Sequence, residues 1–259
     1  MSDEGTVTTN GTSGRLGEGE VSPMSRGVED LGRRFPILRP CESDVEAAVE
    51  ILTSSLRAGG KVLVCGNGGS AADSEHLVAD MMKGFLLDRP IPDVDRKRLL
   101  AIAGPSADEI AAGLQGALAA VALSSEAALT TAIANDVRFD MVFAQQVHGL
   151  GRPGDVLFAI STTGNSPNVI NAAYVARLHD MKVIALTGRD GGGAATVADI
   201  AIRVPAERVH EVQELHLPVY HAIALELEQT FFPDPREIVA VSAAAPAAAQ
   251  ADGADRAEP

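Results

Sequence analysis

Two groups of residues in this chain have the types and spacing to perform chemistry. His76 and Asp80 are four residues apart in a stretch with helical character, so an imidazole and a carboxylate would share one helix face. Such a pair can bind a metal ion or exchange a proton with a substrate. The second group, Gln213, His216 and His221, lies in the last predicted helix. Spacing alone favours Gln213 with His216, because residues eight apart are separated by about 12 Å along an ideal helix.

The loop at 66–70, with the sequence GNGGS, could hold the anionic end of a substrate. It follows an apolar run at 61–65, which predicts a strand buried in a parallel sheet, and it leads into the helix that carries His76. Ser70 and Asp73 stand in capping-box spacing, so we expect Ser70 to cap this helix. The loop amides and the helix N-terminus would then form a phosphate pocket.

A second polar loop, 161–166, has the sequence STTGNS and offers four hydroxyl groups beside a flexible glycine. Neutral donors of this kind can enclose a phosphate. Other nucleotide motifs fit less well. The stretch 66–71 matches G-x-G-x-x-A, but the interval in which a dinucleotide site needs its acidic residue, about twenty residues later, holds an irregular segment. No G-x-x-x-x-G-K-S/T sequence occurs, which excludes a P-loop.

The composition favours helices packed on a parallel sheet. Hydrophobic residues make up 46% of the 259 residues, aromatic residues only 3%, and Trp is absent, so aliphatic side chains must fill the core. The net charge of −14 argues against non-specific nucleic-acid binding, which needs a basic face. Cys41 and Cys65 provide neither a disulfide framework nor a Cys-rich zinc site. With no signal-peptide core and no run of about eighteen apolar residues, we expect a soluble cytoplasmic protein without membrane contact.

The predicted elements alternate along the chain. A helix is predicted from Ser43, where Ser43 and Glu46 form a capping box, and Gly59–Gly60 stops it. Strands are predicted at 61–65, 117–123, 155–160, 182–186 and 199–204, and a last helix at 207–231, interrupted in pattern by Pro218. This alternation predicts an α/β, five-stranded parallel sheet with helices on both faces. Ligands bind at the carboxyl ends of such strands, where both polar loops fall.

Three segments fall outside this alternation. Residues 1–35, rich in Gly, Ser, Thr and Glu, and residues 236–259, rich in Ala and Pro, are expected to be disordered tails. The segment 87–116 holds three prolines and a short helix expected to be capped at Ser106. We interpret it as an insertion that could be a lid, an oligomer contact or a solvated surface excursion. A single domain is therefore predicted over 36–235.

A series of motifs occurs in a fixed order over roughly 43–232. They are GNGGSAAD at 66–73 with His76, AND at 134–136 with FAQQ at 143–146, GRPGD at 151–155, ISTTGNSPN at 160–168, LTGRDGG at 186–192, and QELH at 213–216 with His221. In these motifs the chain resembles the sedoheptulose 7-phosphate isomerases, or phosphoheptose isomerases, of the SIS domain group. The resemblance implies a homotetramer with a flavodoxin-like fold that converts a seven-carbon ketose phosphate to its aldose.

The resemblance also implies a role for each candidate residue. One zinc ion per subunit would be held by His76, Asp80, Gln213 and His221. Asp80 and His221 would transfer protons through an enediol. Substrate would be bound by Asn67, Gly68, Gly69, Ser70, Asp136, Ser161, Thr162, Thr163, Ser166 and Gln213. For Gln213 and His221 to reach one ion, Pro218 must bend the helix, Gln213 must precede it, or neighbouring subunits must complete the site.

Two positions depart from the family pattern, and two other functions stay open. Asp80 stands where Glu is usual, which shortens the carboxylate by one methylene, about 1.5 Å, and His210 stands where an acidic residue is frequent. Some close relatives are non-catalytic SIS tetramers that bind a replication-initiation protein. Isomerases of five- or six-carbon sugar phosphates are the other alternative. Retention of His76 and His221 favours an enzyme over the binding module.

Overall fold

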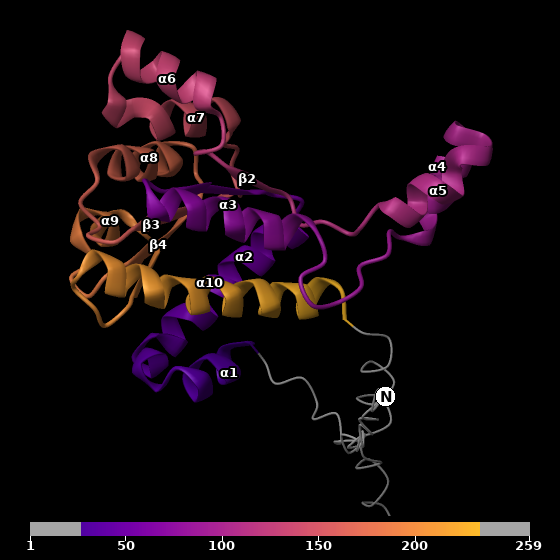
Figure 1. Ribbon diagram of the computed structural model, residues 1–259. Coiled ribbons are helices and arrows are strands. Elements are labelled where there is room, and N and C mark those ends of the chain that lie inside the picture. Colours follow the sequence, from indigo (N-terminus) through magenta and orange to yellow (C-terminus); the bar gives the residue numbers. More distant parts are fainter. Residues whose placement is uncertain (1–26, 234–259) are drawn as a thin grey trace, which may run out of the picture.

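The computed structural model describes residues 27–233, which form one five-stranded parallel sheet flanked by helices (Figure 1). Its strands are β1 (Val62–Cys65), β2 (Ala120–Ala122), β3 (Val156–Ser161), β4 (Lys182–Thr187) and β5 (Ile200–Arg203). Their spatial order, β2-β1-β3-β4-β5, is the flavodoxin-like order of doubly wound folds. The predicted fold class is confirmed, although β2 is only three residues long.

Both faces of the sheet are buried. Val62 and Val64 of β1 belong to one hydrophobic core, whereas Leu63 and Cys65 belong to the other. Successive side chains of a strand point to opposite faces, so an uninterrupted apolar run places side chains in both cores. This double burial fixes the position of β1, and with it the start of the loop at 66–70.

Helices cover the two faces. The first core is closed by α1 (Gly27–Arg34), α2 (Glu42–Arg57), α3 (Gly69–Met82) and α10 (Val209–Phe231), and the second by α6 (Ala127–Asp136), α7 (Val142–Leu150) and α8 (Pro167–Leu178). The remaining helices are α4 (Asp93–Ala103), α5 (Ala107–Gly113) and α9 (Gly192–Val197), with 3₁₀ turns at Pro36–Cys41, Gly104–Ser106 and Phe139–Met141. Within residues 27–233, every helix is too short or too polar to cross a bilayer.

The N-terminal boundary predicted from composition is wrong. Residues 27–34, expected to lie in a disordered tail, form α1, whose Val28 and Leu31 are 6% and 3% exposed and pack in the core beside α10. Two apolar residues three positions apart are too weak a pattern to predict a helix. Packing against α10 supplies most of the stability of α1, and the local sequence does not indicate this packing. Residues 1–26 and the tail predicted at 236–259 lie outside the described residues.

Three predicted helix caps are not made. The helix α2 begins at Glu42, before Ser43, and no side chain caps it. In α3 the N-cap is Gly68, with a φ of 58°, and Ser70 lies inside the first turn. That left-handed conformation favours glycine, so the chain turns there without a hydroxyl cap. Ser106 precedes α5, but its side chain makes no capping hydrogen bond.

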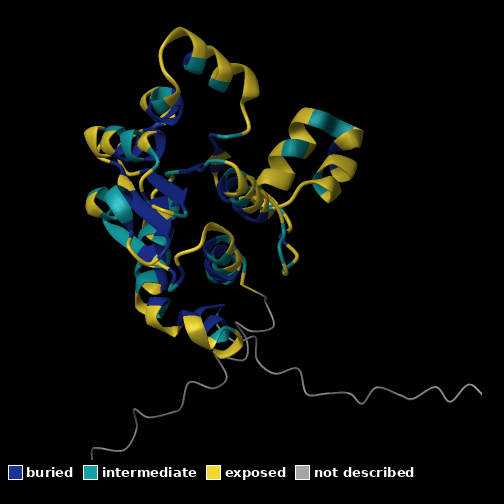
Figure 2. Ribbon diagram, turned by 60° about the vertical axis from the view of Figure 1, so that its left-hand side comes forward, coloured by how far each residue is buried: buried dark blue, intermediate teal, exposed yellow. Residues whose placement is uncertain are grey.

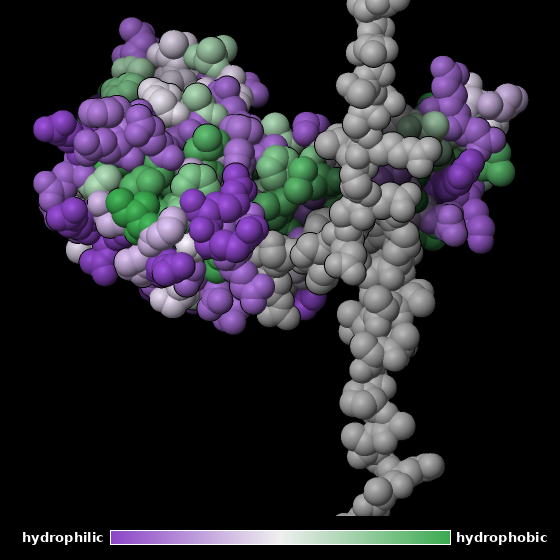
Figure 3. Space-filling model, turned by 60° about the horizontal axis from the view of Figure 1, so that its bottom comes forward, coloured by the Kyte–Doolittle hydropathy of each residue, from purple (hydrophilic) through white to green (hydrophobic). Residues whose placement is uncertain are grey.

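The predicted insertion forms a helical hairpin of α4 and α5 that stands away from the sheet (Figures 1 and 2). No residue of α4 is buried, and its Leu100 and Ile102 are 57% and 83% exposed. Figure 3 shows hydrophobic and hydrophilic residues mixed on this hairpin, beyond the grey atoms. At its base the amide of Gly116 donates to the carbonyl of Arg89. The hairpin therefore joins the body through its base.

We expect Leu31→Ala to lower the free energy of unfolding by about 2–4 kcal/mol, because it removes a buried side chain that packs in the core beside α10. Urea denaturation followed by circular dichroism measures the change. Ile37→Ala, in the same N-terminal region but 54% exposed, should change it by about 0.5 kcal/mol or less. Equal effects of the two substitutions would contradict the packing of α1.

Candidate functional site

Three ionisable side chains meet between α3 and α10. His76 Nε2 lies 3.6 Å from Asp80 Oδ2, and His221 Nε2 lies 3.8 Å from the same oxygen. The two Nε2 atoms are 3.5 Å apart. These separations are longer than good hydrogen bonds, yet the three atoms face one another in a nearly equilateral triangle. The structure thus brings together three of the four residues predicted to bind a metal.

The triangle has the size and the donors that a shared metal ion requires. A point equidistant from atoms at these separations lies about 2.1 Å from each, which is a normal zinc distance for imidazole nitrogen and carboxylate oxygen. Asp80 Oδ2 is buried and has no hydrogen-bond partner within the described structure. Such an oxygen is costly to bury unless a cation compensates it. Two imidazoles and one carboxylate fit a divalent ion and leave a coordination position open.

Burial controls the protonation of this cluster. It raises the pKa of Asp80, against the opposing effect of the two histidines, and it lowers the pKa of His221, against the opposing effect of Asp80. A neutral imidazole keeps the lone pair that a metal needs. His216, which spacing alone favoured, is fully buried and lies outside the cluster, and burial lowers its pKa to about 4.

Gln213 lies at the first polar loop. A Cβ on Gly69 would come within 2.3 Å of Gln213 Nε2, so the amide rests directly against this glycine. The helix α10 starts at Val209 and continues through Pro218, so Gln213 does not precede it. Within one chain, Gln213 therefore contacts the loop at 66–70, while His221 contacts His76. A place for Gln213 at the ion stays a prediction.

The two polar loops follow β1 and β3, which are neighbours in the sheet. Asn67 and Asn168 exchange two amide hydrogen bonds of 2.9 and 2.8 Å, which join the first loop to the first turn of α8. The hydroxyls of Ser161 and Ser166 are 3.3 Å apart. Asn168 is 2% exposed and had no predicted role, although it stands in one of the recognised motifs. It fixes the spacing of the two loops.

The structure does not bring the other predicted substrate-binding residues together in one place as clearly. Ser70 is only 3% exposed within α3. Thr163 is exposed and accepts a hydrogen bond from the amide of Asn165. Asp136 is exposed at the end of α6, where it accepts a hydrogen bond from Asn135. Their contacts with a sugar, like those of Thr162 and Gly68, stay predictions.

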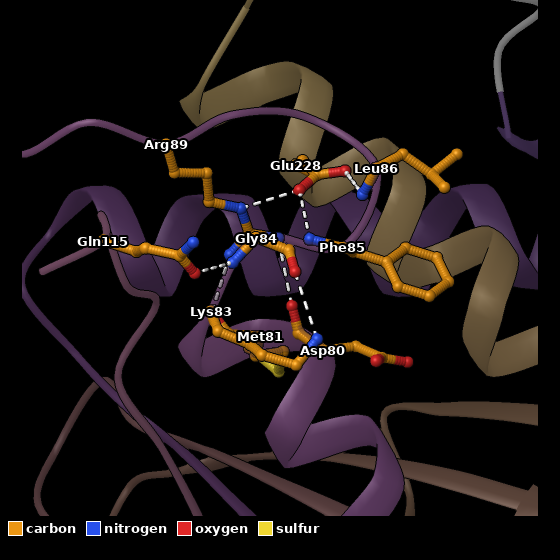
Figure 4. Close-up of polar contacts among 9 residues, drawn as sticks. All are labelled: Asp80, Met81, Lys83, Gly84, Phe85, Leu86, Arg89, Gln115 and Glu228. Carbon is orange, nitrogen blue, oxygen red and sulfur yellow. Dashed lines mark hydrogen bonds and ion pairs between the residues drawn. The ribbon is translucent and has the colours of Figure 1, made fainter. Parts of the chain in front are cut away.

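A buried ion pair that sequence reasoning missed holds the end of α3 (Figure 4). Arg89 Nε donates to Glu228 Oε1 at 2.8 Å, and both side chains are essentially inaccessible to solvent. The same guanidinium donates to the carbonyls of Met81 and Asp80, at 2.9 and 3.0 Å. A cation at the C-terminal end of a helix is favourable, because it meets the unpaired carbonyls there.

Glu228 completes this arrangement from α10. It accepts hydrogen bonds from the amides of Phe85 and Leu86, at 2.7 and 2.8 Å, in the segment that leaves α3 (Figure 4). Glu228 follows His221 by seven residues, about two helical turns, so the two side chains lie on the same side of α10. The ion pair therefore ties the helix that carries Asp80 to the helix that carries His221.

Comparison with known proteins assigns the family. The family model for the SIS domain matches residues 37–95 and 109–188. The phosphoheptose isomerase of Aromatoleum aromaticum is 42% identical over 207 residues, which is 78% of this chain and 91% of that protein. This chain belongs to the phosphoheptose isomerase family of SIS-domain proteins. The resemblance first seen in the motifs is confirmed.

Solved structures of the phosphoheptose isomerase family agree with this assignment. The phosphoheptose isomerase of Neisseria gonorrhoeae is 38% identical with a TM-score of 0.57, over 76% of this chain and 90% of that one. The phosphoheptose isomerase of Francisella tularensis is 30% identical with a TM-score of 0.58, over 79% and 91%. The stretch 96–108, which the SIS family model leaves unmatched, lies in the α4–α5 hairpin.

We expect Glu228→Gln to lower the free energy of unfolding by about 3–5 kcal/mol, because it leaves the buried Arg89 without its counter-charge. Urea denaturation measures the loss. Glu207→Gln is the matched control, since Glu207 pairs with Arg189 on the surface, and it should cost at most about 1 kcal/mol. If the two substitutions cost the same, the buried pair does not anchor α3 to α10.

Proposed function

We propose that this chain is an aldose-ketose isomerase that converts sedoheptulose 7-phosphate to a D-glycero-heptose 7-phosphate. The observation that carries the proposal is the cluster of His76, Asp80 and His221, since His76 and Asp80 lie on α3, the helix that also begins at the first polar loop, and His221 reaches them from α10. Gly69 and His76 are seven residues apart, about 10 Å along α3. That is about the length of an extended seven-carbon chain with its phosphate, so one helix can serve both ends of the substrate.

The polar loops would hold the phosphate. Ser161 and Ser166 present neighbouring hydroxyls, and Asn168 holds the loop of Asn67 against them. Because the body is acidic overall, neutral hydroxyls and amides in a local pocket are the suitable donors for a phosphate. Gln213, which lies against Gly69, would contact the substrate near this loop.

The cluster would move the protons. Isomerisation requires a base that takes a proton from carbon 1 of the ketose, and an acid that serves the oxygens on carbons 1 and 2 while the enediol forms. Return of the proton to carbon 2 gives the aldose. Asp80 is the base in this proposal, since burial raises its pKa and thereby its strength as a base. His221 serves the oxygens in this proposal, and because its Nε2 faces Asp80 and His76 in the cluster, Nδ1 would be the nitrogen that exchanges the proton.

A zinc ion, one per subunit, would be held by His76, Asp80 and His221 and would polarise the two reacting oxygens. Asp80 Oδ2 faces the two histidines, so Oδ1 would be the oxygen that takes the proton. The family resemblance further suggests a homotetramer acting in the cytoplasm. In such an assembly a neighbouring subunit could supply Gln213 as a further ligand.

Incubation of the full chain with sedoheptulose 7-phosphate should give an aldose phosphate, seen by NMR as a new anomeric signal. Chelation of the metal should abolish the reaction, and zinc should restore it. Fructose 6-phosphate and ribulose 5-phosphate serve as controls for sugar length and should react more slowly. Faster turnover of either control would reassign the substrate, and a metal-loaded chain that turns over none of them would favour a non-catalytic binding module.

Asp80→Asn should lower kcat by at least about 100-fold, because an amide cannot accept the proton that general base catalysis requires. Asp80→Glu restores the carboxylate usual in the family and should retain or raise activity. Both variants are to be assayed with saturating zinc, so that loss of the ion is not mistaken for loss of the base. Normal turnover by Asp80→Asn would show that another residue is the base.

A further inference from the structure

Tyr220 makes a pair of contacts that the proposed reaction does not use. Its hydroxyl lies 3.1 Å from His76 Nδ1 and donates to Asp73 Oδ1 at 3.3 Å. The side chain is 1% exposed, and its ring meets the His76 ring edge-on, with centroids 5.5 Å apart. The three side chains come from α3 and α10, the two helices that build the metal cluster. Tyr220 thus contacts the side of the His76 ring that faces away from the cluster.

The two ring nitrogens of His76 face different partners. Nε2 faces Asp80 and His221 in the cluster, and Nδ1 faces the phenol of Tyr220. A neutral imidazole carries one proton, so only one of these nitrogens can donate. To bind a metal through Nε2, His76 must carry its proton on Nδ1. The group that contacts Nδ1 therefore decides whether His76 can be a ligand.

A phenol has a single hydrogen to donate, and Asp73 determines where it goes. A carboxylate accepts hydrogen bonds and has none to donate, so the hydrogen of Tyr220 is directed to Asp73 Oδ1. The phenol oxygen then faces His76 Nδ1 as an acceptor. Asp73 Oδ2 has no hydrogen-bond partner within the described structure, so Tyr220 is the donor that the structure gives this carboxylate.

We propose that Tyr220, oriented by Asp73, is a positioning residue that holds His76 in the Nδ1–H form and so leaves its Nε2 lone pair directed at the metal cluster. The proposal rests on the metal site of the proposed function. Partners behind a metal-binding histidine orient the ring and set its tautomer, and their loss typically weakens metal binding by about 10–100-fold. Here the Tyr220 hydroxyl would orient the His76 ring, and the Asp73 carboxylate would orient that hydroxyl.

Tyr220→Phe tests this with little change in packing, because it removes one oxygen and keeps the ring. We expect the zinc affinity, measured by competition with a chromogenic chelator, to fall by about 10–100-fold. In the metal-free protein labelled with ¹⁵N-histidine, the long-range ¹H–¹⁵N spectrum of His76 should shift from the Nδ1–H pattern toward Nε2–H. Thermal denaturation of each variant reports separately whether the fold is retained.

Asp73→Asn keeps Tyr220 and separates orientation from packing. Its amide can donate to the phenol oxygen and release the phenol hydrogen toward His76 Nδ1, so we expect the same weaker zinc binding and the same tautomer shift. Tyr174→Phe, at a tyrosine of α8 that is 59% exposed, is the matched control and should change neither.

Unchanged zinc affinity and an unchanged His76 spectrum in Tyr220→Phe would overturn the inference. If the unaltered chain itself fails to bind zinc, the metal site of the proposed function is wrong instead. The two failures are therefore told apart by the first measurement. Neither readout depends on turnover, so a different sugar substrate would leave the test intact.

Discussion

The buried pair of Arg89 and Glu228 is the contact on which the geometry of the cluster depends. Asp80 and His221 lie on different helices, so the relative position of α3 and α10 sets the distances within the cluster. A charge pair removed from solvent cannot shift without exposing an unpaired charge, which costs several kcal/mol. Because Arg89 also binds the carbonyl of Asp80, the pair sets the separation of α3 and α10.

The sheet fixes the other end of the site. Doubly buried β1 and β3 lie side by side, so the loops that follow them open at one edge, and Asn67 and Asn168 join those loops directly. The helix α3 then runs from the first loop to the cluster. The first polar loop, His76 and Asp80 are therefore held by one rigid element, and a rigid element places groups more accurately than a loop does.

Apart from the three helix caps, features that depend on local pattern were predictable from the sequence, and features that depend on distant contacts were not. The strand at 61–65, the loop after it and the pairing of His76 with Asp80 belong to one strand-loop-helix unit. His221 lies 145 residues from His76, so its place followed only from the family resemblance. Arg89 and Glu228 are 139 residues apart, and nothing in either neighbourhood indicates the other. The helix α1 was missed because its packing on α10 has a similarly distant origin.

The shorter carboxylate at position 80 makes this anchoring more important than it would be with glutamate. Aspartate has one torsion fewer, so the position of its backbone largely determines where its oxygens lie. Asp80 is 3% exposed, and surrounding atoms restrict the rotations that remain. A displaced α3 could be compensated by the longer side chain of glutamate but hardly by that of aspartate. Arg89 donates a hydrogen bond to the backbone carbonyl of Asp80. The backbone is therefore fixed at the residue whose short side chain has the least freedom to adjust.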